Sequence, residues 1–276
     1  MIAFVGSVFS PYYAWSGRGD PLNHCAVNVA VYGRSGNRWA MTERGRSALE
    51  RSSTRFRLGP SSLSWQDGAL VVELDERGAP IPRAIRGAIR IVPEVLPASS
   101  FTLDAAGRHV WQPIAPRARV TVALARPELG WSGSGYLDSN FGSEPLEAGF
   151  RDWSWSRAHG ESGTTVFYDA VRRDGSDACL ALRFGDDGRV PSLPPLAAAA
   201  LPTTGWRLSR RTRADTADGA TLVSTLESSP FYARSLVEAR LYGEPVLAMH
   251  ESLSLERFRS PVVQAMLTCR MPRRGR

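Results

Sequence analysis

The sequence predicts an antiparallel all-β protein, either a barrel or a sandwich. Helical periodicity is scarce in its 276 residues, whereas short runs rich in β-branched and aromatic residues recur along the chain. Turn pairs such as Asp67-Gly68 and Asp187-Gly188 separate these runs at the intervals typical of hairpins, not of βαβ units. The strands expected from these runs are Cys25–Tyr32, Ala69–Leu74, Ala88–Val92, Arg119–Leu124, Thr164–Val171, Ala178–Phe184, Leu222–Leu226 and Ser235–Leu241.

Two consecutive β domains are expected, residues 1–127 and 128–276, with the boundary near Pro127. A short helix is predicted to start at Pro261, because proline is favoured in the first helical turn. The alanine-rich segment Pro191–Gly205 is predicted to be a loop. The chain starts inside a strand-like run, IAFVGSVF, without a preceding turn, which suggests that the first domain lacks its N-terminal strand.

The composition argues against several classes of function. The formal charge is +7, but all 34 basic residues are arginine and they are scattered, so no nucleic-acid partner is expected. The absence of lysine excludes Schiff-base and P-loop lysine chemistry. The sequence contains no glycine-rich nucleotide motif, no CxxC pair and no HExxH motif, so neither a cofactor nor a metal is expected.

The cellular location expected from the sequence is the cytoplasm, with peripheral membrane association. The N-terminus lacks the basic region of a signal peptide, and no apolar run reaches the roughly 18–20 residues of a membrane span. The positive balance favours contact with anionic lipid, and the tail Arg270–Arg276 is a candidate for a headgroup contact or has no role.

Three pairs of residues two positions apart carry the candidate chemistry: His109 with Trp111, Tyr136 with Asp138, and Trp153 with Trp155. Residues two apart on a strand face the same way, so the members of each pair are expected to share a face. A carboxyl on an aromatic wall is costly to bury and is useful mainly when it stays protonated.

Each of these pairs also has an ordinary structural interpretation. The pair His109–Trp111 fits a half-buried strand with histidine at its rim. Asp138 could cap a turn at Ser139-Asn140, and the two tryptophans Trp153 and Trp155 could simply pack in a core.

The chain resembles the acyclic carotenoid 1,2-hydratase family, also called hydroxyneurosporene synthases. The resemblance covers essentially the whole chain. It is carried by FVGSVFSPYYAWSGRGDPLNHCAVNVAVYG (Phe4–Gly33), WAMTERGR (Trp39–Arg46) and GYLDSNFGSEPLEAGFRDWSWSRA (Gly135–Ala158). It implies two consecutive lipocalin-like antiparallel β-barrels, the first without the aromatic-rich strand that precedes the FVGSVFSPYY motif in other members. It also implies cofactor-independent addition of water to the terminal 1,2 double bond of neurosporene or lycopene.

The family's functional residues match His109, Trp111, Tyr136 and Asp138. Protonation at C2 of the alkene leaves a tertiary cation at C1, which water then captures. Desolvation would keep Asp138 protonated as the acid, since it raises carboxyl pKa values by up to roughly 3–5 units. Trp111 and Tyr136 would stabilise the cation, with Trp153 and Trp155 as further substrate-binding wall. His109 would either orient Asp138 or accept a proton from the water.

Other functions fit parts of this pattern. A lipocalin-like carrier of apolar ligands needs the aromatic residues but not the carboxyl. A carbohydrate-active protein would pair Asp138 with Glu144 or Asp152 at a separation of roughly 5–9.5 Å. A pericyclase-like relative on the same fold is a further alternative, because fold alone does not fix chemistry.

Overall fold

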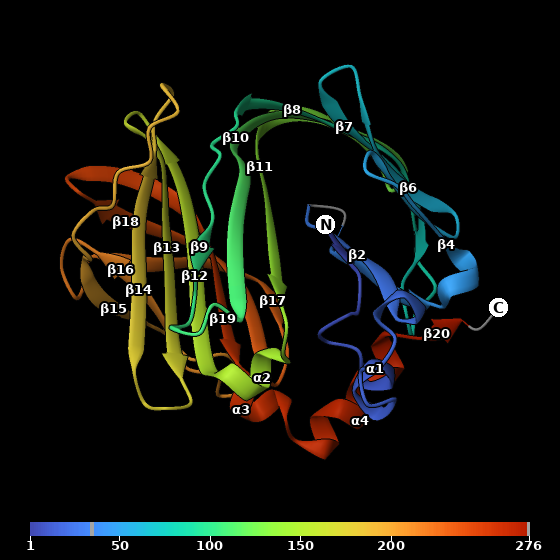
Figure 1. The fold of residues 1–276 in the computed structure, drawn as a ribbon. Coiled ribbons are helices and arrows are strands. Elements are labelled where there is room, and N and C mark those ends of the chain that lie inside the picture. The colour runs from blue at the N-terminus through green and yellow to red at the C-terminus, as the bar shows by residue number, and fades with distance from the viewer. Residues whose placement is uncertain (34–35, 275–276) are drawn as a thin grey trace. The chain divides into compact units, whose positions relative to one another are not determined.

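Strands dominate the structure, a computed structural model that describes residues 1–33 and 36–274. Figure 1 shows long, neighbouring strands and only short helices. The all-β class predicted from the sequence is confirmed, and all eight predicted strands lie within or overlap observed ones. Among the described residues, the strands pair antiparallel, apart from the parallel pairing of β20 with β3. The pairings of these residues close none of the four sheets into a barrel.

The chain forms two compact units that are interleaved along the sequence. The first contains residues 1–93, 118–135 and 264–276, and the second contains residues 94–117 and 136–263. The division into consecutive domains 1–127 and 128–276 stays a prediction. The elements with residues in both units are β8 (Ala84–Val95), β10 (His109–Arg126), β11 (Glu128–Gly142) and α4 (Pro261–Arg270).

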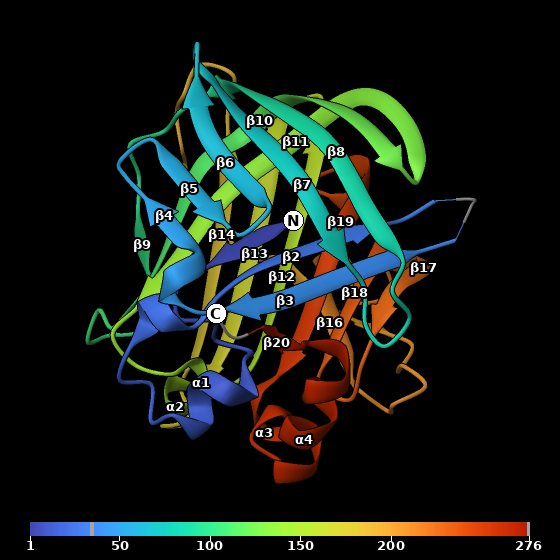
Figure 2. The same ribbon diagram turned by 90° about the vertical axis from the view of Figure 1, so that its right-hand side faces the viewer.

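The first unit is built on two sheets, and Figure 2 shows β2 and β3 of one of them side by side. Its remaining elements are β1 (Ile2–Phe4), α1 (Pro11–Trp15), η1 (Pro21–Asn23), β2 (Cys25–Val31), β3 (Arg38–Arg44), η2 (Arg46–Ala48), β4 (Leu49–Arg51), β5 (Arg55–Leu58), β6 (Ser61–Gln66), β7 (Ala69–Arg77) and β20 (Arg273–Arg274).

The C-terminal segment completes the first unit. Met271 is buried against Ala26 and Met41, and β20 pairs in parallel with β3. Arg273 forms an ion pair with the fully buried carboxylate of Glu43. Arg273 therefore neutralises a buried charge within the first unit. Whether the tail Arg270–Arg276 contacts a lipid headgroup or has no role stays a prediction, and residues 275–276 lie outside the described residues.

The second unit is built around a six-stranded sheet of order β14-β13-β12-β19-β18-β17 and a two-stranded sheet, β15-β16. Its remaining elements are β9 (Phe101–Thr102), α2 (Leu146–Gly149), β12 (Phe150–Gly160), β13 (Gly163–Arg172), β14 (Asp177–Phe184), β15 (Ala197–Leu201), β16 (Arg210–Ala214), β17 (Ala220–Ser228), β18 (Tyr232–Leu241), β19 (Glu244–Ser254) and α3 (Leu255–Phe258).

The two faces of the six-stranded sheet differ in character because side chains alternate along β12. Ser154, Ser156 and Ala158 are buried on one face, where small side chains let other segments pack closely. Leu193 and Leu196 pack against the core of that face. Trp153 and Trp155 occupy the opposite face and are only half-buried.

The sequence predicts a loop for Pro191–Gly205, and this prediction is wrong for part of the segment. Its alanines form strand β15, which pairs with β16 from Ala197↔Ala214 to Leu201↔Arg210. Alanine has a low intrinsic strand preference, so local sequence gives little sign of a strand here, and pairing with β16 decides the outcome. The helix predicted at Pro261 is confirmed as α4.

Candidate active site

The Asp138 carboxyl accepts two hydrogen bonds within the second unit. Asp138 and Tyr136 lie on β11, and Trp111 lies on β10, the next strand in the sheet. Trp111 Nε1 donates to Asp138 Oδ2 at 2.8 Å, and the Tyr136 hydroxyl donates to the same oxygen at 3.0 Å. Asp138 lies inside β11 and does not cap a turn, because the strand continues to Gly142.

Burial raises the pKa of Asp138 to about 6, whereas its ordinary value is 3.8. The hydrogen bonds from Trp111 and Tyr136 act in the opposite direction because they stabilise the carboxylate, and the negative charge of Glu251 raises the pKa further. Burial also raises the pKa of Tyr136 well above its usual value, so this residue remains a neutral phenol and a hydrogen-bond donor. The residue Asp138 is half-buried, and its carboxyl is enclosed by protein atoms.

Aromatic rings surround the two donors. The ring centroids of Tyr136 and Trp155 are 5.3 Å apart, and those of Trp111 and Tyr168 are 5.6 Å apart. Trp153 extends the same cluster, with its ring centroid 5.6 Å from that of Tyr168. Distances of this size are typical of attractive aromatic pairs. The structure therefore brings four predicted aromatic residues together around Asp138, with Trp153 and Trp155 contributed by the neighbouring six-stranded sheet.

Tyr168 belongs to this cluster and was missed in the sequence analysis. It lies on β13 directly opposite Trp155 of β12, so both side chains share a face of the sheet. Its hydroxyl donates to Asn140 Oδ1 at 3.2 Å, two residues beyond Asp138. The register of the β12–β13 hairpin is the signal that would have found it.

A half-buried arginine packs against the Tyr136 ring. The Arg157 guanidinium is 5.7 Å from the centroid of the Tyr136 ring, within the range of a cation–π interaction. Arg157 also donates to the carbonyl of Pro116 at 3.5 Å, and burial lowers the pKa of its guanidinium.

His109 is placed beside Glu144 rather than beside Asp138. His109 Nε2 lies 3.1 Å from Glu144 Oε1, and the imidazole packs against the ring of Phe150 at a centroid distance of 4.8 Å. No contact of His109 with Asp138 is found among the described residues. A Cβ added at Gly149 would lie 2.9 Å from His109 Nε2, so glycine is needed for this close approach. The structure therefore gives no support to direct orientation of Asp138 by His109.

A second carboxylate shares the sheet face of the tryptophans. Glu251 on β19 lies directly opposite Trp155 and, on its other side, opposite Arg234 of β18. Arg234 forms an ion pair with Glu251 at 2.8 Å and a further one with Glu227 at 3.2 Å. Glu144, which the carbohydrate-active alternative pairs with Asp138, contacts His109 Nε2 and forms an ion pair with Arg108 at 3.2 Å.

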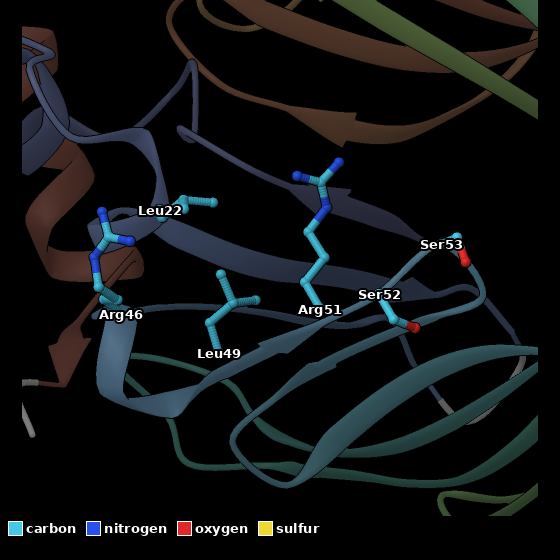
Figure 3. Close-up of a pocket in the computed structure, with 6 residues that line it drawn as sticks. All are labelled: Leu22, Arg46, Leu49, Arg51, Ser52 and Ser53. Carbon is cyan, nitrogen blue, oxygen red and sulfur yellow. The ribbon is translucent and has the colours of Figure 1, made fainter.

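A metal centre is not found in residues 1–33 and 36–274, where no group of three His, Cys, Asp or Glu side chains is placed to hold an ion. In the same residues, no helix has the length and apolar character needed to cross a bilayer. A cavity of about 520 Å³ in the first unit is lined by Leu22, Arg46, Leu49, Arg51, Ser52 and Ser53 (Figure 3). It contains none of the residues described above.

The fold and the site together define an all-β protein with an enclosed carboxylic acid among aromatic rings. A solved structure of an AttH protein from Nitrosomonas europaea is similar to this chain, with a TM-score of 0.58, 13% identity, and coverage of 84% of this chain and 82% of the other. This likeness concerns the fold alone, which is lipocalin-like as predicted.

The sequence comparisons define the family. The chain matches the family model described as carotenoid hydratase CrtC over residues 1–276, and it belongs to this family. It is 57% identical over 279 residues to the acyclic carotenoid 1,2-hydratase of Thiocapsa roseopersicina, a match that spans 100% of this chain and 69% of that protein. It is 49% identical over 280 residues to the acyclic carotenoid 1,2-hydratase of Rubrivivax gelatinosus, across 99% of this chain and 69% of the relative.

Proposed function

We propose that this protein adds water to the terminal 1,2 double bond of acyclic carotenoids such as lycopene and neurosporene. The observation that carries the proposal is Asp138, an enclosed carboxyl with a raised pKa among aromatic side chains, in a member of the carotenoid hydratase family. An alkene is a very weak base, so its protonation needs an acid that keeps its proton near neutral pH. Desolvation meets this need for Asp138.

Asp138 is proposed as the acid that protonates C2. Both hydrogen bonds from Trp111 and Tyr136 reach Oδ2, which leaves Oδ1 as the oxygen that carries and delivers the proton. The same two donors then stabilise the carboxylate that remains after transfer. The two donors thus hold the Asp138 carboxyl in one orientation before and after it transfers its proton.

The aromatic cluster is proposed to stabilise the tertiary cation at C1. Aromatic faces attract a cation by roughly 0.5–2 kcal/mol each without forming a bond that would trap it. Trp111 and Tyr136 are nearest to the acid, and Trp153 and Trp155 provide further wall for the hydrocarbon. The buried phenol of Tyr136 stays neutral, so it does not act as a competing nucleophile.

His109 is proposed as a positioning residue. Its contacts with Glu144 and Gly149 fix the segment that follows β11, the strand carrying Asp138. The substrate is insoluble in water, so delivery from a membrane to a peripherally bound cytoplasmic protein is part of the proposal. The formal charge of +7 favours anionic lipid in such an encounter.

Asp138→Asn tests the proposal, because the amide cannot donate an acidic proton. The purified protein is incubated with lycopene in detergent without added cofactor, and products are examined for a mass gain of one water. We expect the unsubstituted protein to form hydrated product and the variant to form none above background, with an unchanged circular dichroism spectrum. Turnover retained by the variant would exclude Asp138 as the acid. Tight carotenoid binding without turnover by the unsubstituted protein would identify a carrier instead.

A further inference from the structure

The proposed reaction contains a second proton transfer besides the one from the acid to C2. Water that attacks the C1 cation must lose a proton to a base, and Asp138 must regain the proton that it gave to C2. His109 Nε2 is within hydrogen-bond distance of Glu144. The group that accepts the proton from water is therefore to be sought among the other side chains on the face of the six-stranded sheet that carries Trp155.

Glu251 lies on that face at the level of the aromatic cluster. Strands β13, β12, β19 and β18 are consecutive in the sheet, and Figure 2 shows β18 and β19 side by side. Tyr168, Trp155, Glu251 and Arg234 are directly opposite one another across these strands, so they form one row with a common orientation.

Two residues of the row, Trp155 and Tyr168, contact the side chains that donate hydrogen bonds to Asp138. Trp155 packs against Tyr136, and Tyr168 packs against Trp111, and these two partners are the hydrogen-bond donors to Asp138. The pKa of Tyr168 is raised by burial and also by the charges of both Asp138 and Glu251. These contacts place a second carboxylate in the same row as the rings that pack against the two hydrogen-bond donors of Asp138.

Arg234 fixes the position of the Glu251 carboxyl group. Arg234 Nε donates to Glu251 Oε1 at 2.9 Å, and Arg234 Nη2 lies 2.8 Å from the same oxygen. Both contacts engage Oε1, so Oε2 is the oxygen placed to take a proton. The Glu251 side chain is 23% exposed, which admits water to this position.

We propose that Glu251 is the catalytic base that accepts the proton of the attacking water, with Arg234 as its positioning residue. The Asp138 O–H bond breaks as the alkene π pair forms the C2–H bond. The water oxygen then bonds to C1, and its O–H pair stays on oxygen as the proton moves to Glu251. Transfer of this proton from Glu251 to the Asp138 carboxylate, through water, restores both groups, and the net change is the addition of one water.

This assignment rests on the proposed hydration, and an experiment in D2O separates the two. A cation that is not captured by water can return a proton from C2 to Asp138, which leaves deuterium at C2 of the recovered carotenoid. Glu251→Gln should lower hydrated product by about 100-fold or more while deuterium still enters the recovered substrate. Asp138→Asn should abolish both, because no cation forms.

The matched control is Glu238→Gln, which removes a carboxylate that is exposed on the neighbouring strand β18. It should hydrate lycopene at the unsubstituted rate. Glu251→Asp keeps a carboxylate and should recover part of the hydration lost in Glu251→Gln, which distinguishes chemistry from a packing defect.

Two outcomes would overturn the base assignment: hydration by Glu251→Gln within a few-fold of Glu238→Gln, or loss of both hydration and deuterium exchange in Glu251→Gln and Glu251→Asp alike. If the unsubstituted protein exchanges deuterium into lycopene but forms no hydrated product, the proposed function fails and the assignment to Glu251 falls with it.

Discussion

Asp138 is subject to opposing influences that set its protonation at neutral pH. Burial and the charge of Glu251 favour the neutral acid, whereas the hydrogen bonds from Trp111 and Tyr136 favour the carboxylate. The result is a pKa of about 6, so a fraction of the Asp138 carboxyl groups stays protonated at neutral pH.

The pH dependence of hydration follows from this value. Because the protonated form of Asp138 is the proposed acid, kcat/KM should fall about tenfold per pH unit well above pH 6, as long as the fold is intact. Tyr136→Phe removes a donor that stabilises the carboxylate, so the pKa of Asp138 should rise and the decline should move to higher pH. A pH–rate profile with lycopene measures both effects.

Tyr168→Phe is the matched control for the loss of a hydroxyl. The Tyr168 hydroxyl bonds Asn140 rather than Asp138, so its removal should leave the position of the decline unchanged. A decline that moves to lower pH in Tyr136→Phe would contradict the assigned direction of the hydrogen bond.

At the residue scale, the sequence predicts that Tyr136 and Asp138 lie close together, because residues two apart on a strand have their side chains on the same face. The sequence does not predict that His109 contacts Glu144 while Trp111 donates a hydrogen bond to Asp138. Two side chains on the same face of a strand can have different neighbours on the next strand. Tyr168 and Glu251 were missed for a related reason, because cross-strand register depends on pairing between segments far apart in sequence.

At the scale of elements, the short helix α2 and strand β10 meet at His109. Gly142 and Gly149 both approach the imidazole closely enough that an added Cβ would lie 2.9 Å from one of its nitrogens. The ring thus fills the space between the end of β11 and α2. This contact ties the strand that carries the acid to the start of β12.

Gly149→Ala should destabilise the protein by about 1–3 kcal/mol, the usual cost of overpacking. The cause is the clash of the new Cβ with His109 Nε2 and, at 3.0 Å, with Glu144 Oε1. Urea denaturation measures the change. In a His109→Ala background the same substitution should cost clearly less, because the imidazole is gone. Equal costs in the two backgrounds would show that the clash lies elsewhere.

The sequence predicts strands correctly where strand-forming residues flank a pair of residues that favours a hairpin turn. Asp67 and Gly68 both have positive φ, 48° and 72°, as a two-residue hairpin turn between β6 and β7 requires. Tyr242 and Gly243 form an equivalent turn, with φ of 53° and 84°, although tyrosine gives no such signal. In that case the pairing of β18 with β19 imposes the conformation.

At the scale of the whole molecule, the first unit contains a buried polar network. In the first unit, Arg44 makes a two-point contact with the fully buried Glu76, at 3.0 and 2.9 Å, and Ser61 donates to the same carboxylate at 2.7 Å. Removing one partner of a buried ion pair leaves an uncompensated charge, which is more costly than losing the pair as a whole.

Arg44→Met should therefore lower the free energy of unfolding by about 3–5 kcal/mol. The matched control is Arg57→Met in the same unit, because Arg57 pairs with Glu50 at 3.1 Å in an exposed ion pair. That change should have little effect, since exposed pairs contribute little. Urea denaturation of both variants measures the difference, and similar midpoints would show that the Glu76 charge is compensated in another way.

The parallel pairing of β20 with β3 has a consequence for biosynthesis. Arg273 is translated 230 residues after Glu43, the partner whose buried charge it neutralises. Until the ribosome has added residues 271–274, the nascent first unit exposes one edge of β3 and lacks the cover of Met271. The strand edge of β3 is thus covered only after the second unit has been synthesised, so the first unit is completed late in elongation.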